Sequence, residues 1–217
     1  RRRPWRYFIM NKSKRIKKSN FWKVRQKKDQ YFKKSKILGY RSRASFKLIE
    51  LNNKFRFIKK NTHLLDLGSS PGGWSQVASK IITSGKILSI DIKEMDQIKN
   101  VKFLKSNIFD QSTKEFIKTF FKKKIDVIIS DMAADTTGNK SLDSIRTNQL
   151  CAEVILMSSK ILKPKGVFVS KLFMGEDFIE VKNLAKILFK EVNFFKPDSS
   201  KSESKETYLH SKILKTF

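Results

Sequence analysis

The stretch LLDLGSSPGGWSQ, Leu64 to Gln76, joins a short apolar run to a glycine-rich loop that opens a helical pattern. The apolar run predicts a buried strand, and the glycines allow the backbone to approach a ligand closely. Open α/β sheets bind ligands at this carboxyl edge. The loop has Gly68, Gly72 and Gly73 instead of the G-x-G-x-x-G pattern of a dinucleotide site. A cofactor without a diphosphate, another nucleotide-like ligand, or purely structural glycines would each explain it.

On both sides of this stretch, short apolar runs alternate with helical patterns. The patterns predict strands at 63–67, 86–92, 101–106, 125–131, 166–173, 192–196 and 206–214, and helices at 44–53, 74–83, 112–122, 144–163 and 176–190. Pro164 and Gly166 predict a clean end to helix 144–163 before the next strand. The last two strands are joined by too short a loop for a helical crossover, so we expect an antiparallel pair.

The predicted fold class is therefore α/β. It is a Rossmann-like fold with a mostly parallel seven-stranded sheet and a C-terminal antiparallel hairpin. We expect one domain at 37–217, preceded by a basic N-terminal arm at 1–36. In the arm, basic residues are interleaved with aromatic ones, which either stack on nucleic-acid bases or dock on the domain.

The charge balance predicts a polyanionic partner. The chain has 48 Lys and Arg against 20 Asp and Glu, a formal net charge of +28. Such a positive field favours nucleic acid, because each phosphate contact releases condensed counterions. An AT-rich genome would also raise the lysine content, and the 18 phenylalanines fit that alternative.

Cysteine and histidine usage argues against several classes of site. Cys151 is the single cysteine, so an internal disulfide or a multi-cysteine zinc site is excluded. With only His63 and His210, we expect no metal centre. No apolar run reaches the roughly 18 residues of a membrane-spanning helix, and we expect a cytoplasmic protein. An organelle transit peptide is the alternative for the arginine-rich start.

Polar residues follow the next two predicted strands. Asp91 ends the strand ILSIDI, about 20 residues after the glycine-rich loop, where a carboxylate accepts hydrogen bonds from both hydroxyls of a cofactor ribose. Capping of the following turn is the alternative for Asp91. Asn107 follows the third strand, where an amide oxygen can accept from an adenine amine.

Four segments together resemble the FtsJ-type ribosomal-RNA 2′-O-methyltransferase family. They are GYRSRASFKLIEL (39–51), LLDLGSSPGGWSQ (64–76), IISDMAADTTG (128–138) and KPDSSKSESKETYL (196–209). The resemblance covers roughly residues 30–215. It implies a class I methyltransferase fold, S-adenosyl-L-methionine as cofactor, and cofactor contacts at Gly72, Trp74, Asp91 and Asp131. From the glycine-rich loop and the strand ends we also expect cofactor contacts at Gly68, Gly73 and Asn107. Asn107 stands where the family usually has Asp, and Ala134-Asp135 where Pro-Asn is common.

The family's catalytic tetrad of Lys, Asp, Lys and Glu is matched by Lys47, Asp131, Lys171 and Glu206. A ribose 2′-hydroxyl is a weak nucleophile that loses its proton as it attacks a sulfonium methyl. A second ammonium group and partial burial both lower the pKa of a lysine. We therefore expect Lys171, with Lys47 nearby, to act as general base. Glu206 is expected to orient a lysine, and much of the acceleration to come from alignment of the hydroxyl.

The implied reaction is methylation of a ribose 2′-oxygen in RNA, by resemblance a uridine in the A-loop of large-subunit (23S) ribosomal RNA. We expect RNA contacts at Lys36, Arg41 and Arg43 and in the loop 196–208, and a monomer that acts on the large subunit. Solvated charge is the alternative for these residues. Competing functions are a tRNA 2′-O-methyltransferase and a non-catalytic RNA-binding ribosome-assembly factor. An NAD-linked oxidoreductase is disfavoured, because G-x-G-x-x-G is absent.

Overall fold

One sheet organises the molecule in the computed structural model, which describes residues 29–175 and 177–215. The strands of the described part are β1 (Leu64–Leu67), β2 (Ile87–Asp91), β3 (Val101–Lys105), β4 (Ile125–Ser130), β5 (Leu162–Phe173), β6 (Phe189–Phe195) and β7 (Glu206–Leu214). Their order across the sheet is β3-β2-β1-β4-β5-β7-β6. Neighbours from β3 to β5 are parallel, whereas β7 is antiparallel to both β5 and β6. The predicted fold class is confirmed.

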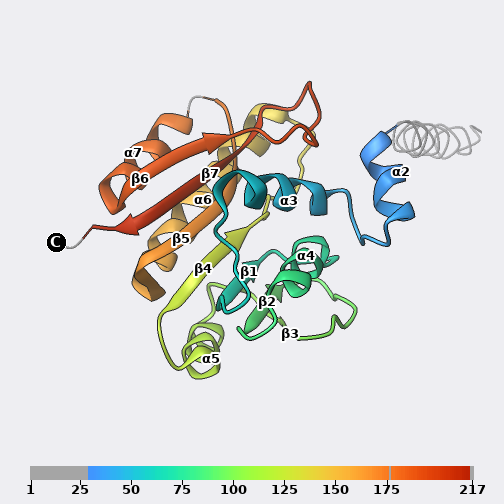
Figure 1. The fold of residues 1–217 in the computed structure, drawn as a ribbon. Coiled ribbons are helices and arrows are strands. Elements are labelled where there is room, and N and C mark those ends of the chain that lie inside the picture. Colours follow the sequence, from blue (N-terminus) through green and yellow to red (C-terminus); the bar gives the residue numbers. More distant parts are fainter. Residues whose placement is uncertain (1–28, 176, 216–217) are drawn as a thin grey trace, which may run out of the picture.

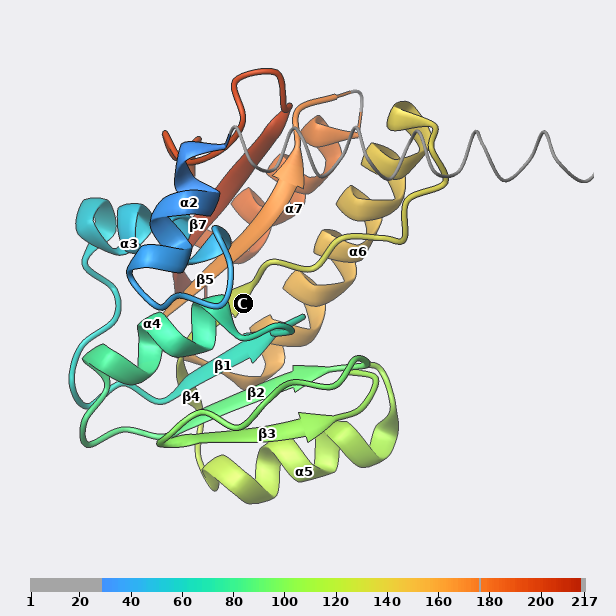
Figure 2. The same cartoon turned by 90° about the vertical axis from the view of Figure 1, so that its right-hand side faces the viewer.

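Helices cover both faces of this sheet (Figures 1 and 2). They are α2 (Gln30–Ile37), α3 (Ala44–Phe55), α4 (Gly73–Ile81), α5 (Gln111–Phe121), α6 (Lys140–Ile161) and α7 (Phe178–Leu188). The apolar residues of α5, α6 and α7 form one buried cluster with the sheet, and those of α3 and α4 form the cluster on the opposite face. Among the described helices, none has the length and apolar composition required to cross a membrane.

Asp29 and helix α2 contain the part of the predicted basic arm that the structure describes. Asp29 caps the helix, accepting hydrogen bonds from the backbone N–H groups of Tyr31 and Phe32. The Tyr31 ring lies 5.5 Å from that of Phe46 on α3. The end of the arm thus docks on the domain, whereas the aromatic residues at 5, 7, 21 and 22 lie outside the described residues.

The connection between α6 and β5 differs from the prediction. Strand β5 begins at Leu162, directly after the helix, so Pro164 and Gly166 lie inside the strand and not in a turn before it. Leu162 pairs with Ile125, and regular pairing with β4 resumes only at Val167. This irregularity accommodates the proline, which has no N–H to donate to a strand ladder. The prediction of a clean stop was therefore wrong.

A carboxyl group is buried in the centre of the sheet. Asp66 on β1 is fully buried, and its Oδ2 accepts a hydrogen bond of 2.6 Å from the Ser75 hydroxyl. Its other oxygen, Oδ1, has no hydrogen-bond partner. Burial raises the pKa of Asp66 to about 7, opposed by the Ser75 hydrogen bond and reinforced by the charges of Asp131 and Asp91. The group is consequently part-protonated at neutral pH.

We expect Asp66→Asn to become more stable relative to the wild type as the pH rises. The folded pKa lies above the ordinary value of 3.8, so the stabilising effect of the bound proton is complete below that value. It is lost as the pH rises through the folded pKa, by about 4 kcal/mol at most. Asparagine has no proton to lose. Urea denaturation of both proteins from about pH 4 to about pH 8 measures the difference. A difference independent of pH would contradict the raised pKa.

Candidate active site

Two neighbouring strands bring a lysine and a carboxylate together at the carboxyl edge of the sheet. Ser130, the last residue of β4, pairs with Ser170 of β5, so Asp131 and Lys171 follow side by side. The Lys171 Nζ donates a hydrogen bond of 2.6 Å to the backbone oxygen of Asp131 and lies 3.2 Å from its Oδ1. Only 10% of the Lys171 side chain is exposed. The pair is held in a fixed, mostly buried geometry.

A second ion pair joins α3 to the start of β7. The Nζ of Lys47 lies 2.6 Å from Oε1 of Glu206, and both side chains are largely buried. The hydroxyl of Ser200 donates a further hydrogen bond of 2.8 Å to the same oxygen. Glu206 therefore fixes the position of Lys47, as the sequence led us to expect for a lysine of the tetrad.

Tyr208 connects the two ion pairs, and sequence reasoning missed it. Its hydroxyl donates a hydrogen bond of 2.8 Å to Oδ1 of Asp131, and the Lys47 Nζ lies 5.7 Å from its ring centre. Burial is the main reason why the pKa of Tyr208 lies well above its ordinary value, and the negative charges of Asp131 and Glu206 raise it further. The hydroxyl therefore keeps its proton. A signal was available: side chains two apart on a strand share a face, and Tyr208 is two residues after Glu206.

The charge of Asp131 follows from these neighbours. Burial raises the pKa of Asp131, but the ammonium groups of Lys171 and Lys47 and the hydrogen bond from Tyr208 outweigh burial and hold that pKa below its ordinary value. Asp131 is therefore ionised at neutral pH. The structure thus brings together all four residues of the predicted tetrad, from α3, β5, β7 and the end of β4.

A cavity of about 400 Å³ opens beside this cluster, at the same edge of the sheet. Its volume lies within the range of small-molecule sites. Asp131 lines both the cavity and the cluster. The other predicted cofactor residues that line it are Gly68, Asp91 and Asn107. Its apolar walls come from Ile90, Ile92, Ile108, Phe109, Met132 and Leu150.

The polar groups of the cavity keep unused acceptor capacity. Asp91 accepts hydrogen bonds of 2.8 Å from the N–H groups of Ser70 and Lys93, one at each carboxylate oxygen. The amide oxygen of Asn107 accepts from the N–H of Phe109 at 3.0 Å. Asp91 therefore does stabilise the following turn, yet each of its oxygens has a second lone pair for a ligand.

Of the three glycines of the glycine-rich loop, Gly68 lines the cavity. Its φ of +73° is unfavourable for other residues, and a Cβ there would lie 2.2 Å from the Cγ of Met132. Gly72 and Gly73 pack instead against Arg41 and Ser42, respectively.

Trp74 is buried in the core, where its Nε1 donates a hydrogen bond of 2.8 Å to the backbone oxygen of Ala44. Gly72, Gly73 and Trp74 are not among the residues that line the cavity. Cofactor contact by these three residues stays a prediction.

The two arginines expected to contact RNA make extensive contacts within the protein. Arg41 donates to the backbone oxygens of Asp96 at 2.6 Å and Gln97 at 2.8 Å, which holds the loop after β2. Arg43 forms an ion pair with Asp29 and donates to the backbone oxygen of Ser199. Lys36 is exposed on α2. Contact of the three with RNA stays a prediction.

The serine- and lysine-rich segment before β7 is anchored to α3. The carboxylate of Glu50 accepts hydrogen bonds from the N–H groups of Asp198 at 2.6 Å and Ser199 at 3.2 Å. Together with the Arg43 contact, these bonds fix the segment that leads to Glu206. Among the described residues, no three His, Cys, Asp or Glu side chains are grouped so that they could hold a metal ion.

Comparisons with known proteins agree with this geometry. A family model described as FtsJ-like methyltransferase matches residues 40–213. The protein named ribosomal RNA large subunit methyltransferase E from Pelagibacter ubique is 46% identical over 94% of this chain and all of its own length. Its namesake from Rickettsia akari is 44% identical, over 93% of this chain and 91% of that protein. The crystal structure of a putative ribosomal RNA methyltransferase from Plasmodium falciparum has a TM-score of 0.72 and 34% identity, covering 81% of this chain and 98% of the other.

We expect Tyr208→Phe to lower the free energy of unfolding by about 1–3 kcal/mol, because the buried Asp131 carboxylate loses a hydrogen bond. Tyr40→Phe is the matched control, since the Tyr40 hydroxyl forms no hydrogen bond with the described residues. Urea denaturation at neutral pH compares the two variants. Equal stabilities would show that the hydroxyl of Tyr208 does not hold Asp131.

Proposed function

We infer, because the chain belongs to the FtsJ-like methyltransferase family, that it is an S-adenosylmethionine-dependent methyltransferase of large-subunit ribosomal RNA. We further propose that the acceptor is a ribose 2′-hydroxyl, by resemblance that of a uridine in the A-loop. The observation that carries the proposal is the cluster of Lys47, Asp131, Lys171 and Glu206 beside the 400 Å³ cavity. The net charge of +28 supports an RNA substrate.

The residues of the cavity fit S-adenosylmethionine. Asp91 would accept hydrogen bonds from the ribose hydroxyls, and Asn107 would accept one from the adenine amine. Ile92 lines the cavity and is 61% exposed, so an aromatic base lying against it would remove apolar surface from water. Gly68 lines the same cavity, and its missing Cβ leaves the room that Met132 of the cavity wall occupies.

S-adenosylmethionine, when bound, supplies an electrophilic methyl group that forms a bond to the ribose oxygen as its bond to sulfur breaks. The protein must align the hydroxyl and accept its proton. We assign the proton to the Nζ of Lys171, which first releases one of its own protons to solvent and then accepts that of the hydroxyl as a neutral amine; it lies next to the cavity residue Asp131. Asp131 holds this amine by two contacts, so the base does not have to be positioned anew in each turnover.

Lys47 and Glu206 complete the site from the other side. The Ser200 hydroxyl holds the carboxylate of Glu206 by a hydrogen bond, and this carboxylate in turn holds the Lys47 ammonium group in a fixed position. A fixed ammonium group attracts the phosphate next to the reacting ribose. It also favours the developing negative charge on the ribose oxygen. We therefore assign Lys47 to substrate alignment and electrostatic stabilisation, and Glu206 to the positioning of Lys47.

We expect Lys171→Ala and Lys171→Arg to lose methyl transfer by at least about 100-fold, the usual contribution of a general base. Arginine keeps the positive charge beside Asp131 but does not lose its proton near neutral pH. Transfer of a radiolabelled methyl group to large ribosomal subunits measures the loss. Binding of S-adenosylhomocysteine by calorimetry serves as the folding control and should be retained. Substantial activity of Lys171→Arg would reduce the role of Lys171 to its charge.

The same assay separates the competing functions. Methyl transfer to tRNA but not to ribosomal subunits would identify tRNA as the substrate. No transfer by the wild type to any RNA would favour a non-catalytic assembly factor. Mapping of the 2′-O-methyl group in the labelled RNA identifies the nucleotide, and a base-methylated product would overturn the 2′-hydroxyl as acceptor.

We expect Asp91→Asn to weaken S-adenosylmethionine binding by about tenfold or more, because one carboxylate acceptor for a ribose hydroxyl becomes a donor. Asp96→Asn is the matched control, since Asp96 is exposed and does not line the cavity. Calorimetry with each variant measures the dissociation constant. Equal affinities for the two variants would remove Asp91 from the ribose site.

A further inference from the structure

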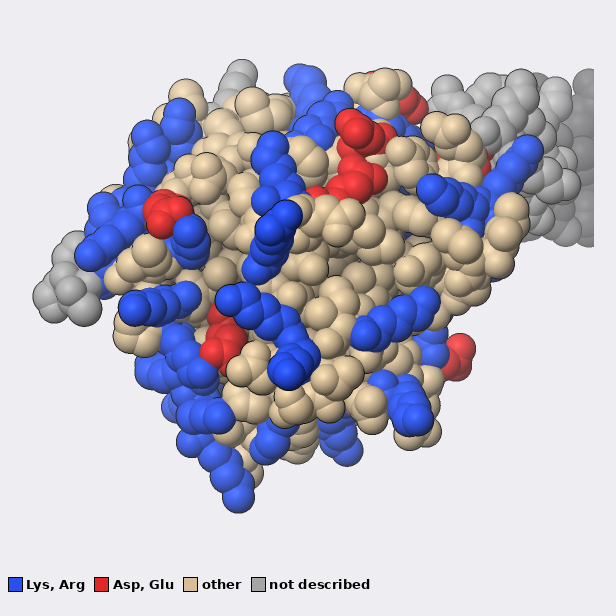
Figure 3. Space-filling view, viewed as in Figure 1, with Lys and Arg blue, Asp and Glu red and all other residues tan. Residues whose placement is uncertain are grey.

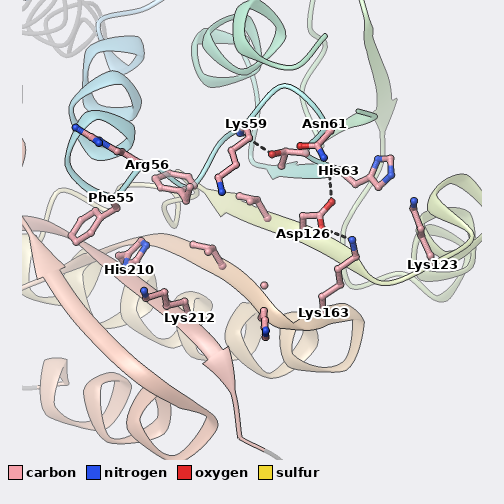
Figure 4. Close-up of a pocket in the computed structure, with 16 residues that line it drawn as sticks. Phe55, Arg56, Lys59, Asn61, His63, Lys123, Asp126, Lys163, His210 and Lys212 are labelled. Atoms are coloured by element: carbon pink, nitrogen blue, oxygen red, sulfur yellow. Dashed lines mark hydrogen bonds and ion pairs between the residues drawn. The ribbon is translucent and has the colours of Figure 1, made fainter. Parts of the chain in front are cut away.

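A second cavity, of about 460 Å³, lies at the opposite edge of the sheet from the candidate active site. Figure 4 shows the residues that line it. It is formed where β1 and β4 begin, by the loop that follows α3, and by the end of β7. On β5, the lining residue Gly166 is five positions before Lys171, a separation of about 17 Å along a strand. The cavity is thus separate from the methyltransferase cluster.

The walls of this cavity are strongly basic. One carboxylate, that of Asp126, lines it together with six cationic side chains, Arg56, Lys59, Lys123, Lys163, Lys165 and Lys212. Figure 3 shows Lys and Arg side chains spread over this side of the molecule, with few acidic groups between them. A basic hollow attracts anions more strongly than a flat surface does, because low-dielectric walls focus the field.

Few of these cations are neutralised by the protein. Lys163 forms an ion pair with Asp126, and Lys212 lies 3.0 Å from Glu191. The ion pair with Lys163, together with a hydrogen bond from the His63 N–H, holds the pKa of Asp126 below its ordinary value in spite of burial. No carboxylate of the described residues forms an ion pair with Arg56, Lys59, Lys123 or Lys165. These four remain available to an anion.

The strand β7 links this cavity to the active site. Side chains at alternate positions share a face of a strand, which here places Glu206, Tyr208, His210 and Lys212 in one row. The first two belong to the methyltransferase cluster and the last two line the basic cavity. Tyr208 and His210 are 0% and 3% exposed, so this face of β7 is covered by the protein, and the strand fixes the distance between the two sites without being a binding surface itself.

His210 forms a buried part of the cavity wall. It is 3% exposed, and neither ring nitrogen has a hydrogen-bond partner. Its ring is stacked on Phe55, with centres 4.0 Å apart and planes 6° from parallel. This face of Phe55 is therefore already covered and is not open for stacking of a base. The accessible groups of the lining are its cationic side chains, which suit a phosphate group better than a base.

We propose that this basic cavity is a second RNA-binding site, which takes backbone phosphates of the substrate RNA at a distance from the methylated ribose. This proposal rests on the proposed function, because it assumes that the RNA bound at the cavity is the RNA that the enzyme methylates. Contacts to phosphates carry no sequence information, so the site adds affinity and orientation and leaves the choice of nucleotide to the active site.

The test compares two triple variants with the same change in net charge. Lys59→Ala/Lys123→Ala/Lys165→Ala removes three exposed lysines of the cavity, and the matched control is Lys102→Ala/Lys186→Ala/Lys190→Ala, whose lysines are exposed and line none of the described cavities. Fluorescence anisotropy measures binding to a long fragment of large-subunit ribosomal RNA and to a short oligonucleotide, at several salt concentrations.

For the long RNA, the cavity variant should bind about tenfold or more weakly, and its slope of log affinity against log salt should fall by about 2. The control variant should stay close to the wild type, and the short oligonucleotide should bind all three proteins alike. Equal losses in the two variants, or an equal loss for the short oligonucleotide, would overturn the proposal.

Two further measurements separate the remaining outcomes. If inorganic phosphate raises the thermal stability of the wild type but not of the cavity variant, while long-RNA affinity is unchanged, the site takes a small phosphate compound and our proposal is wrong. Methyl transfer to large ribosomal subunits tests the proposed function independently. A wild type without transfer would refute the proposed function alone, and normal transfer with unchanged long-RNA binding would refute the second site alone.

Discussion

The hydrogen bond from the Tyr208 hydroxyl to Asp131 is the contact on which the geometry of the candidate active site depends. It joins the Lys171–Asp131 pair on the parallel strands to β7, which carries the partner of Lys47. Two separate ion pairs would each be free to shift with their own element. Because a single buried hydroxyl lies between them, α3, β4, β5 and β7 share one arrangement, and the site becomes a property of the whole sheet.

At this edge of the sheet, neighbouring donors offset the effect of burial on the charge of a carboxylate. Asp131 is mostly buried and still ionised, since two ammonium groups and a hydroxyl surround it, whereas Asp66, one strand away, has a single hydroxyl partner and a raised pKa. Burial alone therefore does not decide the charge of a carboxylate; the number of donors around it does. Lysines in such a site are held by the same carboxylates that they stabilise.

Sequence patterns predicted the sheet because strand and helix periods are local properties. The runs around Leu64, Ile87 and Ile125 are short and apolar, and the strands begin within a residue of the predicted positions. The irregular start of β5 was not predictable in this way, since a bulge beside Pro164 depends on pairing with β4. The tetrad was found through the resemblance, but Tyr208 and the intramolecular contacts of Arg41 and Arg43 depend on residues far away in the chain. No local pattern of charge distinguishes an arginine that faces solvent from one that holds two loops together.

The antiparallel direction of β7 explains how one strand serves both edges of the sheet. The parallel strands place their functional residues at their carboxyl ends, whereas β7 begins at that edge with Glu206 and reaches the opposite edge with Lys212 near its own end. Its register is therefore strictly constrained. A slip by one residue would turn Glu206, Tyr208, His210 and Lys212 to the other face, where Leu209 packs with α6 and α7 in the apolar cluster. It would bury the charges of Glu206 and Lys212 without partners and break the contact with Asp131. The pairing that stabilises the sheet therefore also keeps the active-site cluster and the basic cavity in a fixed relation.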